Sequence, residues 1–134
     1  MPDAKELVGQ TQEARVRLGR SMAGAAESWG DPADGGEWTV RGTAEHALQT
    51  DLYFSRAIAD VIGVEAPAER TLTLESAEAA ATALREVESD VMAVLNQISD
   101  ADLEKPSPVL GQMYATVVLV AHHLNMHALQ IAER

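Results

Sequence analysis

The sequence predicts an all-α protein that folds as one four-helix-bundle domain spanning residues 1–134. Apolar residues recur every three or four positions through four long stretches, which is the period of an amphipathic helix. Alanine is plentiful, whereas the aromatic residues are only two Trp, two Tyr and one Phe, and this composition favours helix over strand. The chain has 134 residues, of which 46% are hydrophobic, so it has the size and the core material of a single domain.

The first helix is expected to begin after Asp3, a suitable N-cap residue. It should end before the turn formers GDPADGG at residues 30–36. One apolar stripe runs along it at spacings of three, four and seven. The members of this stripe are Ala4, Leu7, Ala14, Leu18, Met22, Ala25 and Trp29.

The second helix is expected from Val40 to about Ile62. Thr39 is its N-cap, and Gly63 stands where a C-terminal glycine is common. The connection VEAPAERTLTL, residues 64–74, follows it. We expect no convincing strand anywhere in the chain, and the alternating TLTL at residues 71–74 is too short to form one.

The third helix has the cleanest apolar period and is expected from Ala77 to Ile98. The segment 99–111, with two prolines and a glycine, ends it. The fourth helix is expected from about Gln112 to Ala132. Its first half is apolar almost all round, which is typical of a helix buried against several neighbours.

Charge and composition exclude several classes of function. The formal net charge of −11 argues against binding of nucleic acid and of an anionic membrane surface. The chain has no cysteine, which excludes disulfides, thiolate zinc sites and a cysteine nucleophile. The first 20 residues lack the apolar core of a signal peptide, and the longest apolar run, YATVVLVA at 114–121, is too short to span a bilayer. The expected location is the cytoplasm.

Three of the four histidines lie within six residues of the fourth helix. A helix advances about 100° per residue, so His123 and His127 are about 40° apart and can converge on one point. His122 is about 100° from His123 and cannot join the pair on the same ion. We therefore expect His122 to be a surface residue, a partner contact or a group beside a ligand.

A pair of histidines is an incomplete metal site, and His46 is the only remaining histidine. Catalytic sites for zinc and related ions commonly use three protein ligands and keep a position open. His46 can complete the set only if the start of the second helix lies beside the later half of the fourth. On spacing alone, packing is the commoner role for such histidines, because the pair lacks the Glu of a His-Glu-x-x-His motif.

Two longer motifs strengthen the metal-site hypothesis. EWTVRGTAEHALQTDLYFSRAI, residues 37–58, resembles the second-helix motif of the DinB/YfiT-like superfamily, and HLNMHALQI, residues 123–131, is similar to its last-helix motif. The resemblance implies that His46, His123 and His127 bind a divalent ion, most often zinc or nickel, with water in the open positions. Ala128 and Leu129 stand where many relatives carry Arg-Gly, which is a departure from the family pattern.

The resemblance also implies an activity. Many members of the family take part in reactions of low-molecular-weight thiols such as mycothiol or bacillithiol, and others resemble mycothiol-dependent maleylpyruvate isomerase. The chain would then be an enzyme, a metal-dependent thiol S-transferase or isomerase that acts on a small-molecule substrate with an external thiol. One alternative is a non-catalytic dimer that binds a ligand or partner and whose metal is structural or absent. Another is a metal-hydroxide hydrolase.

Other residues near the three histidines have possible supporting roles. Asp51 and Gln130 could accept hydrogen bonds from the ligand rings. Arg41 could bind the carboxylate of a thiol cofactor, although a surface salt bridge is the commoner role for such a residue. Trp38 could form a wall of the pocket or a buried staple.

Two further expectations concern packing and assembly. Met113 and Met126 are expected to be core fillers rather than metal ligands. Proteins of the resembled family often form homodimers. The apolar fourth helix is compatible with a homodimer and equally with a buried core helix.

Overall fold

Four long helices form a bundle in the computed structural model, which describes residues 2–34 and 38–133. They are α1 (Ala4–Gly24), α2 (Val40–Ile62), α3 (Ala77–Leu95) and α4 (Met113–Ala132). The predicted all-α class is therefore confirmed. None of the helices in the described part of the chain has both the length and the apolar character needed to cross a bilayer.

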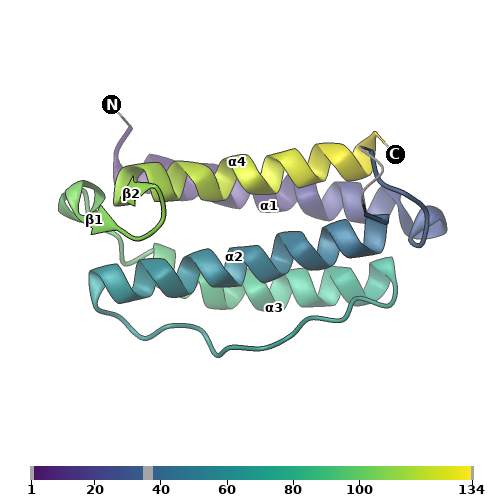
Figure 1. Ribbon diagram of the computed structural model, residues 1–134, viewed down its shortest axis with the longest axis horizontal. Coiled ribbons are helices and arrows are strands. Elements are labelled where there is room, and N and C mark those ends of the chain that lie inside the picture. The colour runs from purple at the N-terminus through teal and green to yellow at the C-terminus, as the bar shows by residue number, and fades with distance from the viewer. Residues whose placement is uncertain (1, 35–37, 134) are drawn as a thin grey trace.

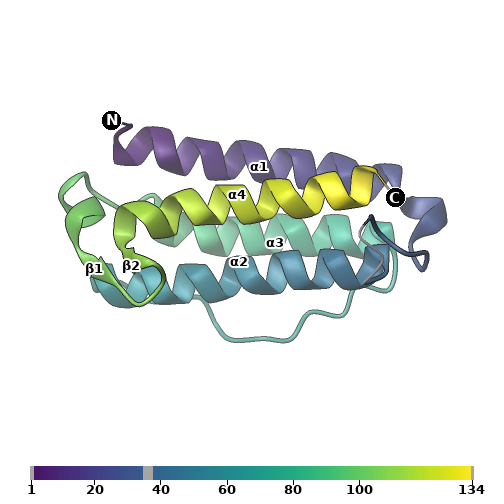
Figure 2. The same cartoon turned by 45° about the horizontal axis from the view of Figure 1, so that its top comes forward.

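The helices pack as a square in which α1 and α2 lie on a diagonal. α1 packs against α3 and α4, and α2 packs against the same two helices (Figures 1 and 2). α1 and α4 run in one direction, and α2 and α3 run in the other (Figure 1). Because α2 and α4 are antiparallel neighbours, the start of α2 lies beside the end of α4. This is the arrangement that a site of His46 and the two α4 histidines requires.

Capping residues define where the helices begin and end. The Asp3 side chain accepts a hydrogen bond from the amide of Glu6, and the Thr39 side chain accepts one from the amide of Gly42. Both caps were predicted, and Ser76 caps α3 in the same way. Gly63 ends α2 with a left-handed φ of 76°, which residues with a Cβ rarely adopt.

Two helix ends differ from the sequence prediction. The first helix ends at Gly24 and is followed by the short 3₁₀ helix η1 (Ala26–Ser28), although Ala25 and Trp29 remain buried. The third helix ends at Leu95, and Ile98 is buried in the turn that follows. In both places the apolar pattern continues past the helix because the chain turns back onto the core.

A long crossover connects the parallel helices α2 and α3 and runs along the bundle (Figure 1). Side chains of α2 form hydrogen bonds with the backbone of the crossover, which has no strand partner. The Gln49 amide donates to the carbonyl of Arg70 (2.7 Å) and accepts from the amide of Leu72 (3.0 Å). The Glu45 carboxylate accepts from the amide of Leu74 (2.8 Å). The alternating TLTL segment is therefore extended without belonging to a sheet.

A small hairpin precedes α4, and its existence contradicts the expectation of no strand. Strand β1 (Pro106–Ser107) pairs antiparallel with β2 (Gly111–Gln112), and the 3₁₀ helix η2 (Ala101–Glu104) precedes the pair. The turn at residues 108–110 ends with Leu110, which has a φ of 58°, and Gly111 at the start of β2 has a φ of 81°. Two-residue strands with Pro and Gly in them leave no alternating pattern in the sequence.

We predict that Gly63→Ala destabilises the protein by about 1–2 kcal/mol, the steric cost of a left-handed backbone for a residue with a Cβ. Urea unfolding followed by circular dichroism measures the change. Gly9→Ala is the matched control, because Gly9 lies inside α1 and a Cβ there meets nothing within 4 Å. The control should stabilise the protein by up to about 1 kcal/mol. Equal stabilities of the two variants would contradict the prediction.

Candidate metal centre

Three histidines from two helices meet at one end of the bundle. His46 lies in the second turn of α2, and His123 and His127 lie on successive turns of α4. One ring nitrogen of each lies within 4.8 Å of the others. The centroid of the His46 ring is 5.1 Å from the centroid of the His123 ring and 5.0 Å from that of the His127 ring.

The separation of the two nitrogens on α4 fits a first-row metal ion. The Nε2 atoms of His123 and His127 are 3.0 Å apart. Two nitrogens bound about 2.1 Å from one ion are about 3.0–3.4 Å apart, depending on the coordination angle. His122, on the neighbouring face of the helix, is exposed. As the helical angles predict, His123 and His127 converge, and His122 lies apart from them.

Burial keeps the three imidazoles in the form that binds metals. It lowers the pKa of His46 and of His127, although the hydrogen bond to Gln130 acts in the opposite direction on His127. Burial, with repulsion from His127, His46 and His122, lowers the pKa of His123 to about 4. Neutral imidazole has a lone pair free for an ion, so no proton has to leave before binding at neutral pH.

Hydrogen bonds orient two of the rings. The Nδ1 of His127 is 2.7 Å from Oε1 of Gln130. The ring nitrogen donates to this carbonyl oxygen, so Nε2 keeps its lone pair and faces the other histidines. Gln130 is therefore the acceptor that the sequence suggested. Thr50, which the sequence analysis did not single out, places its hydroxyl 3.5 Å from Nδ1 of His46.

Asp51 does not have the role suggested for it. Its carboxylate is buried and binds Arg15 through two hydrogen bonds of 2.7 and 2.8 Å. The suggestion that it accepts from a ligand ring is therefore wrong. The sequence did contain a signal, because Arg15 falls on the apolar face of the first helix between Thr11 and Leu18, and a charge there needs a buried partner.

A cavity of about 300 Å³ opens beside the three histidines. Trp38 lines it, and its ring centroid is 4.5 Å from that of His46. Since Trp38 is 43% exposed, it is a wall of the cavity and not a buried staple. Met126 also lines the cavity and is 39% exposed, which corrects its assignment as a core filler, whereas Met113 is fully buried as expected.

The loop before α2 brings a carboxylate to this cavity. Asp34 lines it, and the backbone amide of Asp34 donates to the carbonyl of Gln130 (3.0 Å). The loop is thereby attached to the residue that also orients His127. In the sequence, Asp34 is only one of the turn formers at residues 30–36, and nothing in its spacing indicates the tertiary contact.

Arg41 lies close to the site but outside the cavity wall. Its guanidinium pairs with Glu45, one turn further along α2, at 3.2 Å. The residues that the structure describes around the cavity do not include it. Its role in binding a cofactor carboxylate stays a prediction.

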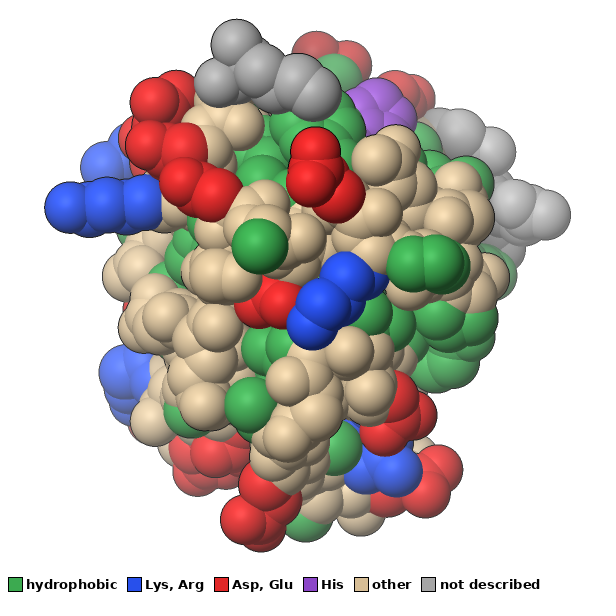
Figure 3. All heavy atoms as spheres, turned by 90° about the vertical axis from the view of Figure 1, so that its left-hand side faces the viewer, with side chains coloured by type: hydrophobic (Ala, Val, Ile, Leu, Met, Phe, Trp, Pro, Cys, Tyr) green, Lys and Arg blue, Asp and Glu red, His purple; other side chains and the backbone are tan. Residues whose placement is uncertain are grey.

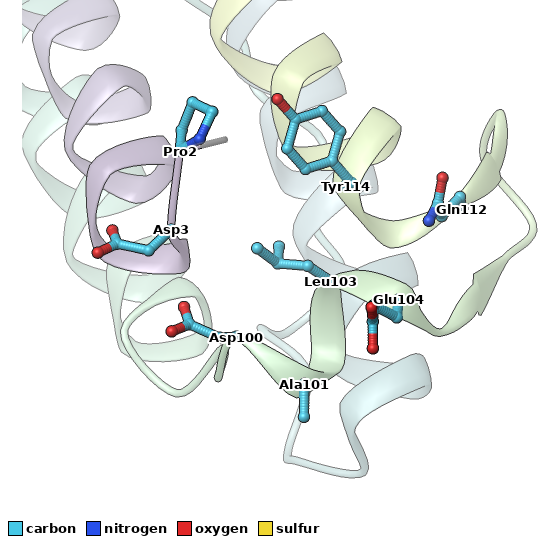
Figure 4. Close-up of a pocket in the computed structure, with 8 residues that line it drawn as sticks. All are labelled: Pro2, Asp3, Asp100, Ala101, Leu103, Glu104, Gln112 and Tyr114. Carbon is cyan, nitrogen blue, oxygen red and sulfur yellow. The ribbon is translucent and has the colours of Figure 1, made fainter.

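A larger cavity of about 450 Å³ lies at the opposite end of the bundle (Figure 4). Figure 3 shows this end, where acidic side chains are dispersed among apolar and uncharged ones. Two carboxylates of this cavity already serve the start of α1, because Asp3 caps the helix and Asp100 accepts from the amide of Ala4 (2.8 Å). These two carboxylates of the cavity therefore have a structural role.

Comparison with known proteins gives one finding. A family model described as the DinB superfamily matches residues 4–131. This match covers the four helices and all three converging histidines. No curated protein and no solved structure matches the chain.

We predict that the metal-free protein loses stability as the pH falls from about 6.5 to 4. The pKa of His123 is about 4 in the folded protein and near 6.5 in the unfolded chain. Between these values the unfolded chain binds more protons, so acidification favours unfolding. Urea unfolding at several pH values in the presence of a chelator measures the slope.

Replacement of His123 by Asn should flatten this dependence, because it removes the histidine with the largest shift. His122→Asn is the matched control and should keep most of the slope of the wild-type protein, because repulsion from His122 is the smallest of the causes that lower the pKa of His123. A His123→Asn slope equal to that of the wild type would show that this ring does not set the pH dependence.

Proposed function

The chain belongs to the DinB superfamily, and from this premise we propose that it is an enzyme whose His46, His123 and His127 bind one divalent ion. The convergence of three neutral ring nitrogens within 4.8 Å of one another carries the proposal. Imidazole donors suit zinc and nickel. Such an ion, when bound, lowers the pKa of a coordinated water or thiol and so supplies a nucleophile at neutral pH.

The composition of the ligand set supports a catalytic site over a structural one. Structural zinc sites are closed by four protein ligands, whereas catalytic sites keep a position for water or substrate. Within residues 2–34 and 38–133, the ligand group consists of three histidines, and the fourth histidine of the chain is exposed on another face. An adjoining cavity of about 300 Å³ gives a substrate access to the open side.

Residues around the cavity would prepare the site for reaction. The Trp38 ring beside His46 and the Met126 side chain form apolar walls of the cavity. Gln130 fixes the orientation of His127. Asp34 brings a carboxylate to the cavity and can accept a proton from a molecule that enters it.

The favoured reaction is transfer of an external thiol to a small electrophilic substrate, or a related thiol-dependent isomerisation. The chain has no cysteine, so the thiol must come from a low-molecular-weight compound such as mycothiol or bacillithiol. A cavity of this volume is at the small end of ligand sites and would enclose the reacting part of such a thiol. Arg41, which pairs with Glu45 through Nε, would bind the thiol's carboxylate through its other guanidinium nitrogens.

A metal-hydroxide hydrolase would use the same three histidines. The two reactions differ in their need for a thiol. Substrate turnover that is equally fast without any thiol would favour hydrolysis.

A homodimer is the second part of the proposal, and the outer face of α4 supports it. No Asp, Glu, Lys or Arg occurs from Met113 to Ala132. This helix nevertheless exposes Val118, Met126 and Leu129. A two-fold interface places the same patch of both subunits together, so a helix without charged side chains reduces repulsion between two chains of net charge −11, although Arg17 and Arg20 of α1 border Leu129. A non-catalytic dimer would share this face but not need an open metal site.

We predict that protein purified without a histidine tag or chelator carries about one equivalent of divalent metal per chain. His46→Ala, His123→Ala and His127→Ala should each lose most of it, because two imidazoles hold such an ion poorly. Elemental analysis by mass spectrometry measures the content. His122→Ala, next to the site but not in it, is the control and should keep the metal. Wild-type protein that stays metal-free after incubation with zinc and nickel would contradict the proposed metal site.

We also predict that Leu129→Lys converts the dimer to a monomer, because two-fold symmetry brings like charges together in an apolar interface. Sedimentation equilibrium gives the mass of the particle. Val16→Lys is the matched control: Val16 is 47% exposed and Leu129 is 57% exposed, but Val16 lies on α1. The same mass for wild type and Leu129→Lys would contradict an interface on this face.

A further inference from the structure

An ion pair crosses the centre of the bundle. The Arg15 guanidinium donates from Nε and Nη2 to the two carboxylate oxygens of Asp51, and both side chains are fully buried. Arg15 also donates to the hydroxyl of Thr11 (2.9 Å), and its Nη1 lies 3.4 Å from the sulfur of Met92. The pair therefore joins α1 to α2 and contacts α3.

The position of this pair is unusual because α1 and α2 are the diagonal helices, which do not pack directly on each other. Among the described residues, it is the only ion pair that joins two of the four long helices. The other ion pairs lie within one helix or involve the connections between helices.

Stability alone is a weak reason for a charged pair in this place. Removing two charges from water costs about as much as their attraction returns, and apolar residues of similar volume often serve as well or better. A buried polar pair can instead specify one alignment of helices, since each charge has a single partner. Small apolar residues such as Ala44 and Ala47 on the core face of α2 restrict sliding less.

The alignment of α2 with α4 matters for the site, because α2 supplies only one of the three histidines and α4 supplies the other two. No side-chain hydrogen bond or ion pair joins α2 to α4 in the part of the chain that the structure describes. Both helices are instead tied to α1 at nearby positions. Arg15 binds Asp51, which is five residues from His46, and Arg17 donates to Asn125 (3.0 Å), which is two residues from His123.

We propose that Arg15 and Asp51 are positioning residues that set the axial register of His46 against His123 and His127. This inference rests on the metal site proposed above, but the register itself can be measured without metal. A slip of α2 by one residue would displace His46 by about 1.5 Å and rotate it by about 100°. Either change removes its nitrogen from the other two.

The test is the double variant Arg15→Met/Asp51→Leu, which removes both charges at similar volume and leaves neither unpaired. Its melting temperature should equal or exceed that of the wild type. Its zinc affinity, measured by competition with a chromophoric chelator, should fall by about tenfold or more. The matched control is Arg70→Met/Asp90→Leu, which removes a partly exposed pair between the crossover and α3. The control should keep the wild-type affinity.

A second readout uses the metal-free protein. The His46 and His123 rings are 5.1 Å apart, so nuclear Overhauser effects between their ring protons should appear in the wild type and the control. They should weaken or vanish in the Arg15/Asp51 double variant. If the wild-type protein binds no zinc, the proposed metal-dependent function is wrong. The ring-proton signals of the metal-free protein would still test the register proposal.

Unchanged zinc affinity together with unchanged ring signals in a folded double variant would overturn the proposal. If that variant does not fold, the variant Asp51→Glu tests the register proposal instead. It keeps both charges but lengthens the acid by one methylene, and so should shift α2 and lower the zinc affinity of a folded protein. Wild-type affinity and ring signals in Asp51→Glu would overturn the proposal equally.

Discussion

The antiparallel packing of α2 against α4 is the constraint on which the rest of the site depends. It brings the second turn of one helix beside the last turns of the other, and so places His46 next to the pair on α4. In a bundle with these helices parallel and their starts level, the helical rise would separate His46 from His127 by about 12 Å along the axis, and a diagonal placement would separate them across the bundle. The long crossover between α2 and α3 makes the observed packing possible, because it lets those two helices run in the same direction.

Burial then determines the chemistry of the three rings. Desolvation disfavours the charged form of all three rings, and repulsion from neighbouring rings further lowers the pKa of His46 and of His123. The neutral rings place one nitrogen each within 4.8 Å of the others. A divalent ion bound there would take a lone pair from each ring and replace their repulsion with coordination, and Asp34 and Trp38 line the adjoining cavity.

The helical pattern predicted most of the fold, because apolar period and capping residues are local properties. Thr39 and Gly63 set the limits of α2 as expected. The separation of His122 from His123 and His127 also followed from local geometry. Features that depend on tertiary contacts were missed. Asp51 found its partner 36 residues away on another helix, the Asp34 loop is held by the end of α4, and the two-residue strands of the hairpin carry no pattern of their own.

X-ray absorption spectroscopy of the zinc- or nickel-loaded protein tests the central claim most directly, because it counts the ligands of the ion. The structure predicts about three imidazole nitrogens near 2.1 Å and the remaining positions filled by oxygen from water. A spectrum with one imidazole or none would mean that the ion binds elsewhere on this acidic chain. In that case the convergence of His46, His123 and His127 would have a packing role only.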